Sequence, residues 1–247
     1  MKRVLRLFNQ LPDFLPRRCP LCDLRVSQSR ALCQACTGDL PWLNNPCSQC
    51  GLALGKAEDS YCADCLRDPP AFDHCFAPLV YAPPLDYLIA AFKYRAQLGH
   101  GELLADLLIE YLRHCYSQQP WPTRVLPVPL HWRRRLRRGF NQSEILAYRL
   151  ARQLPIKLDF ASCRRLRATA AQQGQTRAQR KHSLRQAFQV QGDFSGQHVA
   201  ILDDVVTTGS TVNEIAQLLR LAGAARVDIW ALARTPSADF SLPQGPL

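Results

Sequence analysis

Short, mostly apolar runs alternate with segments of helical periodicity from residue 76 onward. Such runs predict buried strands, because a strand covered on both faces needs no alternation of polar residues. The predicted strands are residues 76–81, 125–130, 163–167, 187–190, 199–202 and 227–232. Their alternation with helices is typical of an open α/β fold with a parallel sheet.

Apolar residues at helical spacing predict the intervening helices. Residues 85–92 and 103–112 have this spacing, with a break near Gly99-His-Gly101, and further helices are predicted from Gln142 and from about Thr211. Residues 2–11 indicate a short amphipathic helix docked on the body, with a membrane-surface anchor as the weaker alternative. The pattern predicts neither a signal peptide nor a membrane span, so we expect a cytoplasmic protein.

The apolar run at 199–202 leads into two acids and a turn of small residues. Asp203 and Asp204 follow the strand directly, at the end where open α/β sheets bind ligands. The turn continues as Thr207, Thr208, Gly209, Ser210 and Thr211. Its hydroxyl and N–H groups can bind a phosphate at the start of the next helix, and the carboxylates can accept hydrogen bonds from sugar hydroxyls. The stretch therefore indicates a site for a phosphorylated sugar.

This stretch resembles the thirteen-residue motif that binds phosphoribosyl pyrophosphate (PRPP) in type I phosphoribosyltransferases. The apolar lead, the paired acids and the Thr-Thr-Gly-Ser-Thr ending all match. The resemblance implies a site for PRPP or ribose 5-phosphate formed by Asp203, Asp204, Val205, Val206, Thr207, Thr208, Gly209, Ser210 and Thr211. The alternatives are an ordinary strand-to-helix turn with solvated acids and an Asp pair that holds Mg²⁺ in a phosphotransfer protein.

Eight of the eleven cysteines form four C-x-x-C pairs within 47 residues, separated by ten, ten and eleven residues. Two such pairs close a tetrahedral site with no open position, so the pattern predicts two structural zinc ions. The predicted ligands are Cys19, Cys22, Cys33, Cys36, Cys47, Cys50, Cys62 and Cys65. We pair them in order, as two zinc ribbons in tandem, with interleaved pairing as the alternative.

The same cysteines could instead form redox pairs, disulfides or an iron–sulfur cluster. A reducing compartment disfavours disulfides, and four regular pairs exceed the needs of a redox motif, whereas Cys₄ ligation alone does not choose between zinc and iron. A segment this small is expected to need its metal to fold. Cys75, Cys115 and Cys163 lack the spacing and are expected to be small buried hydrophobic residues.

A basic segment lies between the predicted strand at 125–130 and the helix that starts at Gln142. Its cationic or titratable side chains are His131, Arg133, Arg134, Arg135, Arg137 and Arg138. Guanidinium groups bind phosphate oxygens in pairs, so the segment indicates a pyrophosphate loop. Residues 120–190 carry sixteen Lys or Arg and two acids, a net charge of +14 compared with +11 for the whole chain. This surplus predicts a positive surface for a polyanion such as single-stranded DNA, with a merely solvated basic surface as the alternative.

A shift in composition near residue 70, the cysteine spacing and the resemblance to the PRPP motif together predict four segments: an N-terminal amphipathic segment (1–18), a double zinc ribbon (19–70), a phosphoribosyltransferase-like domain (71–235) and a C-terminal tail (236–247). A polar, Gln-rich stretch at 168–180 is predicted to be a lid. Such a lid would exclude water from a cationic ribosyl centre.

The order of these features resembles the ComF/GntX family over roughly residues 19–235. The matching features are the C-x-x-C repeats, Phe92-Lys93, Pro127-Val-Pro-Leu130, Arg138-Gly-Phe-Asn-Gln142, the basic loop ending at Ala187-Phe188 and the PRPP motif. The resemblance implies an amidophosphoribosyltransferase-type fold with an N-terminal double zinc ribbon, and a role in natural competence, DNA uptake or the use of DNA as a nutrient. Ser183 stands where the family usually has Asn, a departure within the lid.

The resemblance also implies a role for each site residue. Asp203 and Asp204 would be catalytic, holding the ribose hydroxyls while a nucleophile attacks ribosyl C1 and pyrophosphate leaves, with Mg²⁺ bound alongside PRPP. The pyrophosphate and basic-loop residues are Lys93, His131, Arg135, Arg138, Asn141 and Gln142. The alternative is a non-catalytic adaptor of DNA processing that binds single-stranded DNA, docks a partner such as a helicase, and has a vestigial or regulatory PRPP pocket.

Overall fold

The computed structural model describes residues 18–26, 32–55, 59–95, 97–166 and 187–237. The chain divides into two compact units, residues 1–40 and 41–247. The larger unit contains the second cysteine tetrad together with the central sheet. The four segments predicted from the sequence, with a boundary near residue 70, stay a prediction. The predicted helix at 2–11, the lid at 168–180, Ser183 and almost all of the C-terminal tail lie outside the described residues.

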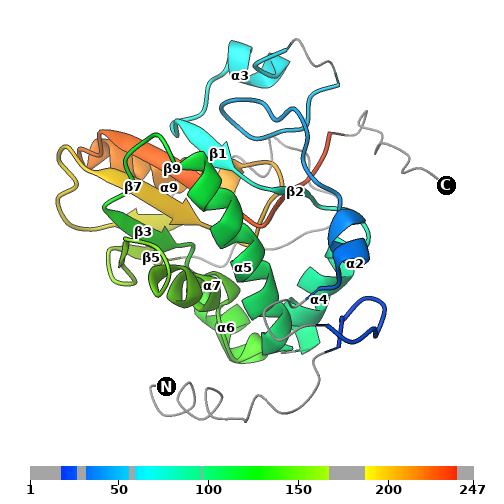
Figure 1. Cartoon of the computed structure of the whole chain (residues 1–247). Coiled ribbons are helices and arrows are strands. Elements are labelled where there is room, and N and C mark those ends of the chain that lie inside the picture. The colour runs from blue at the N-terminus through cyan, green and yellow to red at the C-terminus, as the bar shows by residue number, and fades with distance from the viewer. Residues whose placement is uncertain (1–17, 27–31, 56–58, 96, 167–186, 238–247) are drawn as a thin grey trace. The chain divides into compact units, whose positions relative to one another are not determined.

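A five-stranded sheet forms the centre of the larger unit (Figure 1). Its strand order is β1-β9-β7-β3-β4, and every pairing is parallel. The strands are β1 (His74–Phe76), β3 (Arg124–Pro127), β4 (Lys157–Leu158), β7 (His198–Leu202) and β9 (Arg226–Trp230). The last four residues of both β7 and β9 are buried, as the apolar runs predicted for strands covered on both faces. The open, parallel α/β fold is confirmed.

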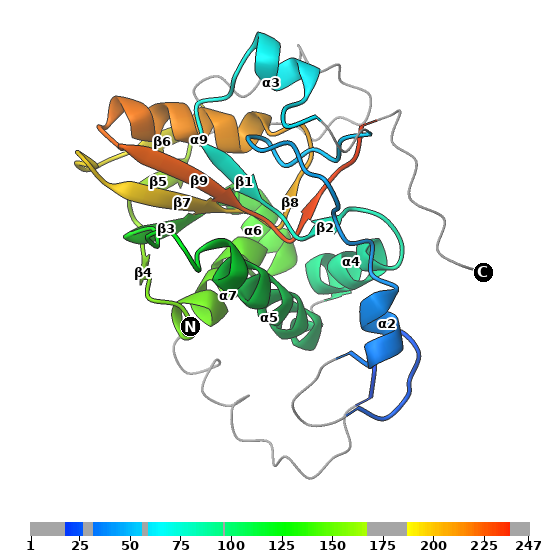
Figure 2. The ribbon, with the colours of Figure 1, turned by 45° about the horizontal axis from the view of Figure 1, so that its top comes forward.

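Helices cover both faces of this sheet. Figure 2 shows α9 (Ser210–Leu221) on one face and α5 (Leu98–Cys115) with α7 (Gln142–Ala151) on the other. A fourth helix, α4 (Leu85–Arg95), packs against α5. The apolar periodicity of the sequence predicted these four helices, and the N-terminus of α9 follows the paired acids at the carboxyl end of β7.

The break between α4 and α5 was predicted in the wrong place. α4 ends at Arg95 and α5 begins at Leu98, so Gly99 and Gly101 both lie inside α5. Gly101 is there for packing, because a Cβ at this position would lie 2.5 Å from the Phe92 ring. The glycine therefore allows α5 to approach α4 closely and does not interrupt the helix.

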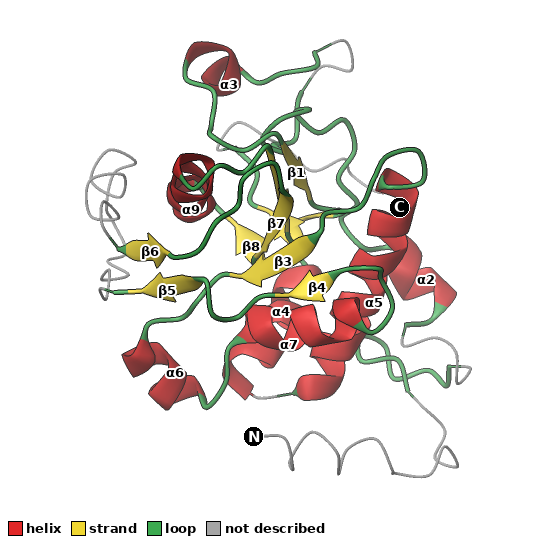
Figure 3. Ribbon diagram, turned by 90° about the vertical axis from the view of Figure 1, so that its left-hand side faces the viewer, coloured by secondary structure: helices red, strands yellow, loops and turns green. Residues whose placement is uncertain are grey.

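Two smaller sheets accompany the central one. A parallel sheet contains β2 (Leu79–Val80), β10 (Ala233–Arg234) and β8 (Val205–Val206), in that order. An antiparallel pair, seen at one side in Figure 3, contains β5 (Cys163–Arg165) and β6 (Phe188–Val190). The single strand predicted at 76–81 is thus divided between the central sheet and the β2 sheet.

Three short helices complete the described elements. α2 (Gln34–Gly38) and α3 (Ala63–Arg67) each begin directly after a cysteine of a C-x-x-C pair. The third is α6 (Trp132–Arg138), so the basic segment predicted as a loop is helical. Residues 132–138 contain no Gly or Pro, and Leu and Arg have high helix propensity, so these residues form a helix although their charges suggested a phosphate loop. None of the helices in the described ranges has both the length and the hydropathy to cross a bilayer.

Candidate functional site

The eight cysteines of the C-x-x-C pairs gather into two tetrads in sequence order, so interleaved pairing is excluded. Within each tetrad the four sulfur atoms lie within 4.8 Å of one another. The Sγ atoms of Cys22 and Cys33 are 3.6 Å apart, as are those of Cys50 and Cys62. Thiolates at ~2.3 Å from a tetrahedral zinc would lie about 3.8 Å apart. The first tetrad is Cys19, Cys22, Cys33 and Cys36, and the second is Cys47, Cys50, Cys62 and Cys65.

Backbone N–H groups point at sulfur in both tetrads. The N–H of Cys36 donates to Cys33 Sγ at 3.4 Å, and the N–H of Cys62 donates to Cys47 Sγ at 3.3 Å. All eleven cysteines are free thiols, which contradicts the disulfide alternative. Four sulfur donors with hydrogen-bonded thiolates and no open position fit a structural zinc ion in each tetrad.

The two acids of the PRPP motif leave the carboxyl end of β7 with different partners. Lys93, from α4, places Nζ 2.9 Å from Asp204 Oδ1, and both side chains are mostly buried. Asp203 Oδ1 instead accepts hydrogen bonds from the Asp204 N–H at 2.8 Å and from Ser143 Oγ at 3.3 Å. Asp204 therefore has a cation of its own, and Asp203 has none at ion-pair distance among the described residues.

This difference in partners appears in the ionisation of the site. Removal of its carboxyl group from water, together with the neighbouring Asp204 carboxylate, raises the pKa of Asp203 to about 7. Burial alone would lower the pKa of Lys93, but the Asp204 carboxylate outweighs burial, and the net shift is upward. Lys93 is thus held as a cation, and Asp203 changes charge near neutral pH.

The turn after the acids, residues 207–211, is the segment predicted to bind a phosphate, and we call it the phosphate loop. Gly209 caps α9 with a φ of +77°, a left-handed conformation that the absence of a side chain permits. Thr208 Oγ1 and Ser210 Oγ lie 2.9 Å apart, so the two hydroxyls stand together at the helix start. The first N–H groups of an α-helix have no partner within the helix, and its dipole favours an anion there.

Arg138 joins this region through a chain of contacts. Its Nη1 donates to Gln142 Oε1 at 3.2 Å, and its guanidinium lies 4.9 Å from the centre of the Tyr94 ring. Gln142 Nε2 in turn donates to the Lys93 carbonyl at 3.5 Å. Lys93, which pairs with Asp204, is therefore linked through Gln142 to Arg138, although the contact of these three residues with pyrophosphate stays a prediction.

The other predicted basic-loop residues have structural partners in the protein. Arg135 forms two contacts with Glu144, at 2.9 and 3.1 Å. Asn141 is the N-cap of α7, where it accepts from the Ser143 N–H and donates to the Val128 carbonyl. His131 is buried after β3. These contacts assign none of the three residues to a phosphate, so the roles of Arg135, Asn141 and His131 stay predictions.

Two residues near the site were missed by the sequence reasoning. Ser143 donates to Asp203, and its only sequence signal is its position next to Gln142 at the predicted helix start. Arg234 contacts the backbone carbonyls of Val206 and Thr207, and its sequence signal is a lone charge at the end of an apolar strand region.

Comparisons with known proteins agree with this geometry. Residues 11–66 match the double zinc ribbon domain family, and residues 141–240 match the phosphoribosyl transferase domain family. Both parts were predicted from the sequence, and both are confirmed.

Relatives that match most of this chain are also found. The DNA utilization protein YhgH of Salmonella typhi is 38% identical over 224 residues, covering 90% of this chain and 98% of that protein. Competence protein F of Haemophilus influenzae is 34% identical over 229 residues, covering 90% of this chain and 99% of that protein. An amidophosphoribosyltransferase of Pseudomonas aeruginosa is 30% identical over 171 residues, covering 68% of this chain and 30% of that protein.

Proposed function

The chain belongs to the ComF/GntX family of phosphoribosyltransferase-like proteins with a double zinc ribbon, and from this premise we propose that it binds PRPP or ribose 5-phosphate and acts in DNA uptake or the use of DNA. The observation that carries the ligand is the paired acids beside a phosphate loop at the carboxyl end of β7. The names of the relatives, a DNA utilization protein and a competence protein, support the biological setting.

In this proposal each part of the motif binds a different part of the ligand. Asp203 and Asp204 accept hydrogen bonds from the ribose hydroxyls. The N–H groups at the start of α9, with the hydroxyls of Thr208 and Ser210, bind the 5′-phosphate. Lys93 and Arg138 provide cations for the pyrophosphate.

The site also suits Mg²⁺ and a transfer reaction. Mg²⁺ prefers oxygen ligands, and Asp203 and Asp204 supply carboxylate oxygens next to the position proposed for the ribose hydroxyls. Mg²⁺ bound with PRPP would neutralise charge on the pyrophosphate. If the protein transfers the ribosyl group, the acids and cations act mainly by positioning PRPP and by stabilising charge as pyrophosphate leaves C1.

Isothermal titration calorimetry tests the ligand. We expect the wild type to bind PRPP with Mg²⁺, and the double variant Asp203→Asn, Asp204→Asn to give no binding heat. Asp193→Asn, an exposed carboxylate before β7, is the matched control and should bind as the wild type does. Absence of binding by the wild type to both PRPP and ribose 5-phosphate would reject the proposal.

A second candidate function is the binding of single-stranded DNA. Tyr94 is 66% exposed and has the Arg138 guanidinium over its ring, an arrangement that can stack a base beside cations. Trp132, at the start of the basic helix α6, is also exposed. In this candidate function the zinc ribbons dock a DNA-processing partner such as a helicase.

The two functions respond to different variants. Charge reversal of Arg133, Arg134 and Arg137 should weaken binding of an oligonucleotide and reduce its dependence on salt, because fewer counterions are released. Asp203→Asn with Asp204→Asn should leave oligonucleotide affinity nearly unchanged. If the double variant Asp203→Asn, Asp204→Asn weakens DNA binding as much as the arginine variants do, the two ligands share one site and the separate DNA surface is rejected.

A further inference from the structure

A buried arginine connects the second cysteine tetrad with the phosphate loop. Arg234 lies at the end of β10 and is 6% exposed. Its Nε donates to the carbonyl oxygen of Cys50, a member of the tetrad, at 3.0 Å. Its Nη1 donates to the carbonyl oxygens of Val206, at 3.1 Å, and Thr207. One guanidinium therefore holds a metal-ligating turn and two peptide groups of the PRPP motif.

The contacts with Val206 and Thr207 orient the loop's donors. In a trans peptide the C=O of one residue and the N–H of the next point in opposite directions. Because Arg234 attracts the carbonyls of Val206 and Thr207, the N–H groups of Thr207 and Thr208 face away from it. These N–H groups belong to the segment proposed to bind phosphate, and their direction is set before any ligand arrives.

A second connection runs from the same ribbon to helix α9. Gln49, inside the tetrad's first C-x-x-C pair, donates to the Phe72 carbonyl at 3.2 Å. The neighbouring Ala71 donates its N–H to Asn213 Oδ1 at 2.7 Å and accepts from Arg220 Nε at 3.1 Å. Asn213 and Arg220 both lie on α9, the helix that begins at the phosphate loop. The ribbon therefore contacts both the loop and the helix behind it.

We propose that Arg234 is a positioning residue through which the Cys47, Cys50, Cys62 and Cys65 site fixes the conformation of the phosphate loop. A filled second metal site then raises the affinity for ribose 5-phosphate, and the first tetrad has no such effect. The affinity statement rests on the proposed function, whereas the effect on loop conformation does not. Lysine cannot replace this arginine, since an ammonium group lacks the planar fork that reaches Cys50 and the loop together.

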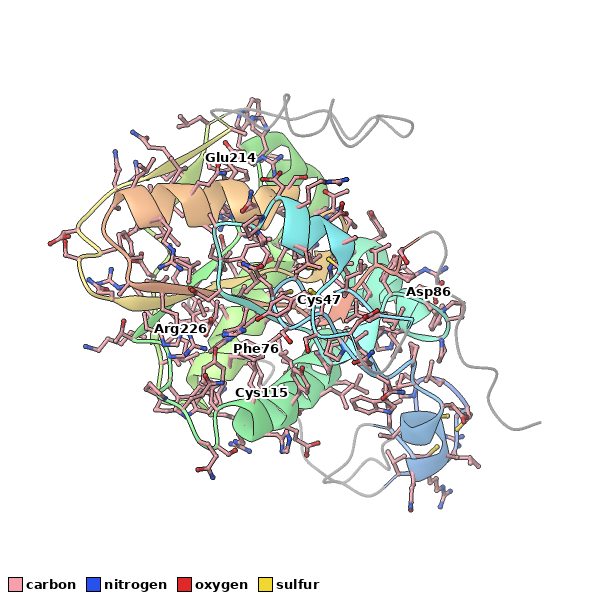
Figure 4. The ribbon with its side chains drawn as sticks, turned by 90° about the horizontal axis from the view of Figure 1, so that it is seen from above. Cys47, Phe76, Asp86, Cys115, Glu214 and Arg226 are labelled. Atoms are coloured by element: carbon pink, nitrogen blue, oxygen red, sulfur yellow. The ribbon has the colours of Figure 1, made fainter. Side chains whose placement is uncertain are left out.

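The variant Arg234→Lys tests the connection, with Arg226→Lys as the matched control. Arg226 is the first residue of β9, whereas Asp203 and Asp204 lie at the edge of the sheet where the strands end. Figure 4 shows Arg226 well separated from Cys47. We expect amide hydrogen exchange of residues 205–211 to be about tenfold faster in Arg234→Lys, and ribose 5-phosphate to bind about tenfold more weakly. Zinc content and the exchange of β7 should equal those of the wild type. Arg226→Lys should change neither the loop's exchange nor the affinity.

A second pair of variants tests the metal directly. Cys62→Ser and Cys33→Ser should each reduce the zinc content by one ion, but only Cys62→Ser should speed exchange at residues 205–211. Equal exchange of the loop in Arg234→Lys and Arg226→Lys overturns the proposal, even if Cys62→Ser fails to fold. Exchange needs no ligand, so a wild type that does not bind ribose 5-phosphate rejects the proposed function and leaves this test valid.

Discussion

Asp203 and Asp204 are neighbours in the chain, but only Asp204 is neutralised by a cation. Lys93 lies 2.9 Å from Asp204, while the donors to Asp203 in the described part of the chain are uncharged. Removal of the Asp203 carboxyl group from water, together with the Asp204 carboxylate beside it, favours the neutral form and raises the pKa of Asp203 to about 7. The charge of the site therefore changes within the range of cellular pH.

This shift has a consequence for stability. The folded-state pKa of Asp203, about 7, lies above its ordinary value of 3.8, so the folded protein binds this proton more tightly than the unfolded chain does. Stability is thereby lost as pH rises between these two values. We expect the melting temperature of the wild type to fall relative to that of Asp203→Asn between about pH 4 and pH 7. Calorimetric melts that keep a constant difference across this range would contradict the shift.

The Lys93 and Asp204 pair should be strongly coupled. A double-mutant cycle with Lys93→Gln and Asp204→Asn is expected to give a coupling energy of about 1–3 kcal/mol in urea unfolding, because both side chains are mostly buried. The exposed pair Arg67 and Asp64 is the control, with a coupling below about 1 kcal/mol. Equal coupling in the two cycles would show that water screens Lys93.

At the scale of elements, the turn between β7 and α9 determines the site. Gly209→Ala forces a side chain into a left-handed conformation and should cost about 1–2 kcal/mol of unfolding free energy. It should also weaken ribose 5-phosphate binding, since the loop shifts. Gly99→Ala is the control: this helical glycine is exposed with open space around its Cβ position, so stability should stay equal or rise by up to about 1 kcal/mol. Denaturant titrations of both variants measure whether the unfolding free energy falls in Gly209→Ala and is unchanged or rises in Gly99→Ala.

Elements with a strong apolar pattern were predicted well, and the others were not. The run at 199–202 predicted β7 correctly, because a strand that is buried on both faces needs apolar side chains at consecutive positions. The basic segment was predicted as a loop but forms α6, since its charges suggested a ligand while its helix propensity decided the backbone. Spacing likewise predicted the cysteine tetrads, whose ligands are close in sequence.

Contacts between distant residues set what the sequence could not predict. Arg135 pairs with Glu144 in the following helix, a partner that the sequence did not indicate, and its predicted contact with pyrophosphate stays a prediction. Arg234 bonds to Cys50, 184 residues away in the chain, and no local pattern encodes such a contact. Residue types at a site follow from its chemistry, whereas their partners depend on the packing of whole elements.

At the scale of the whole molecule, the metal content should match the two tetrads. We expect two zinc ions per chain. Removal of these ions by a chelator should greatly lower the stability of the protein. Cys19→Ser should retain one ion. Cys115→Ser, which changes a cysteine outside both tetrads, should retain two. Elemental analysis of the purified proteins counts the ions, and a value of one for the wild type would contradict the two-site arrangement.

Hydrogen exchange of the wild type with and without ribose 5-phosphate tests the central claim most directly, since it reports where the ligand binds. The account predicts that the ligand slows amide exchange in residues 203–211 and in the first turn of α9. Exchange at the first tetrad, Cys19, Cys22, Cys33 and Cys36, should not change. Protection confined to other segments, or none at saturating ligand, would contradict a ribose phosphate site at the paired acids.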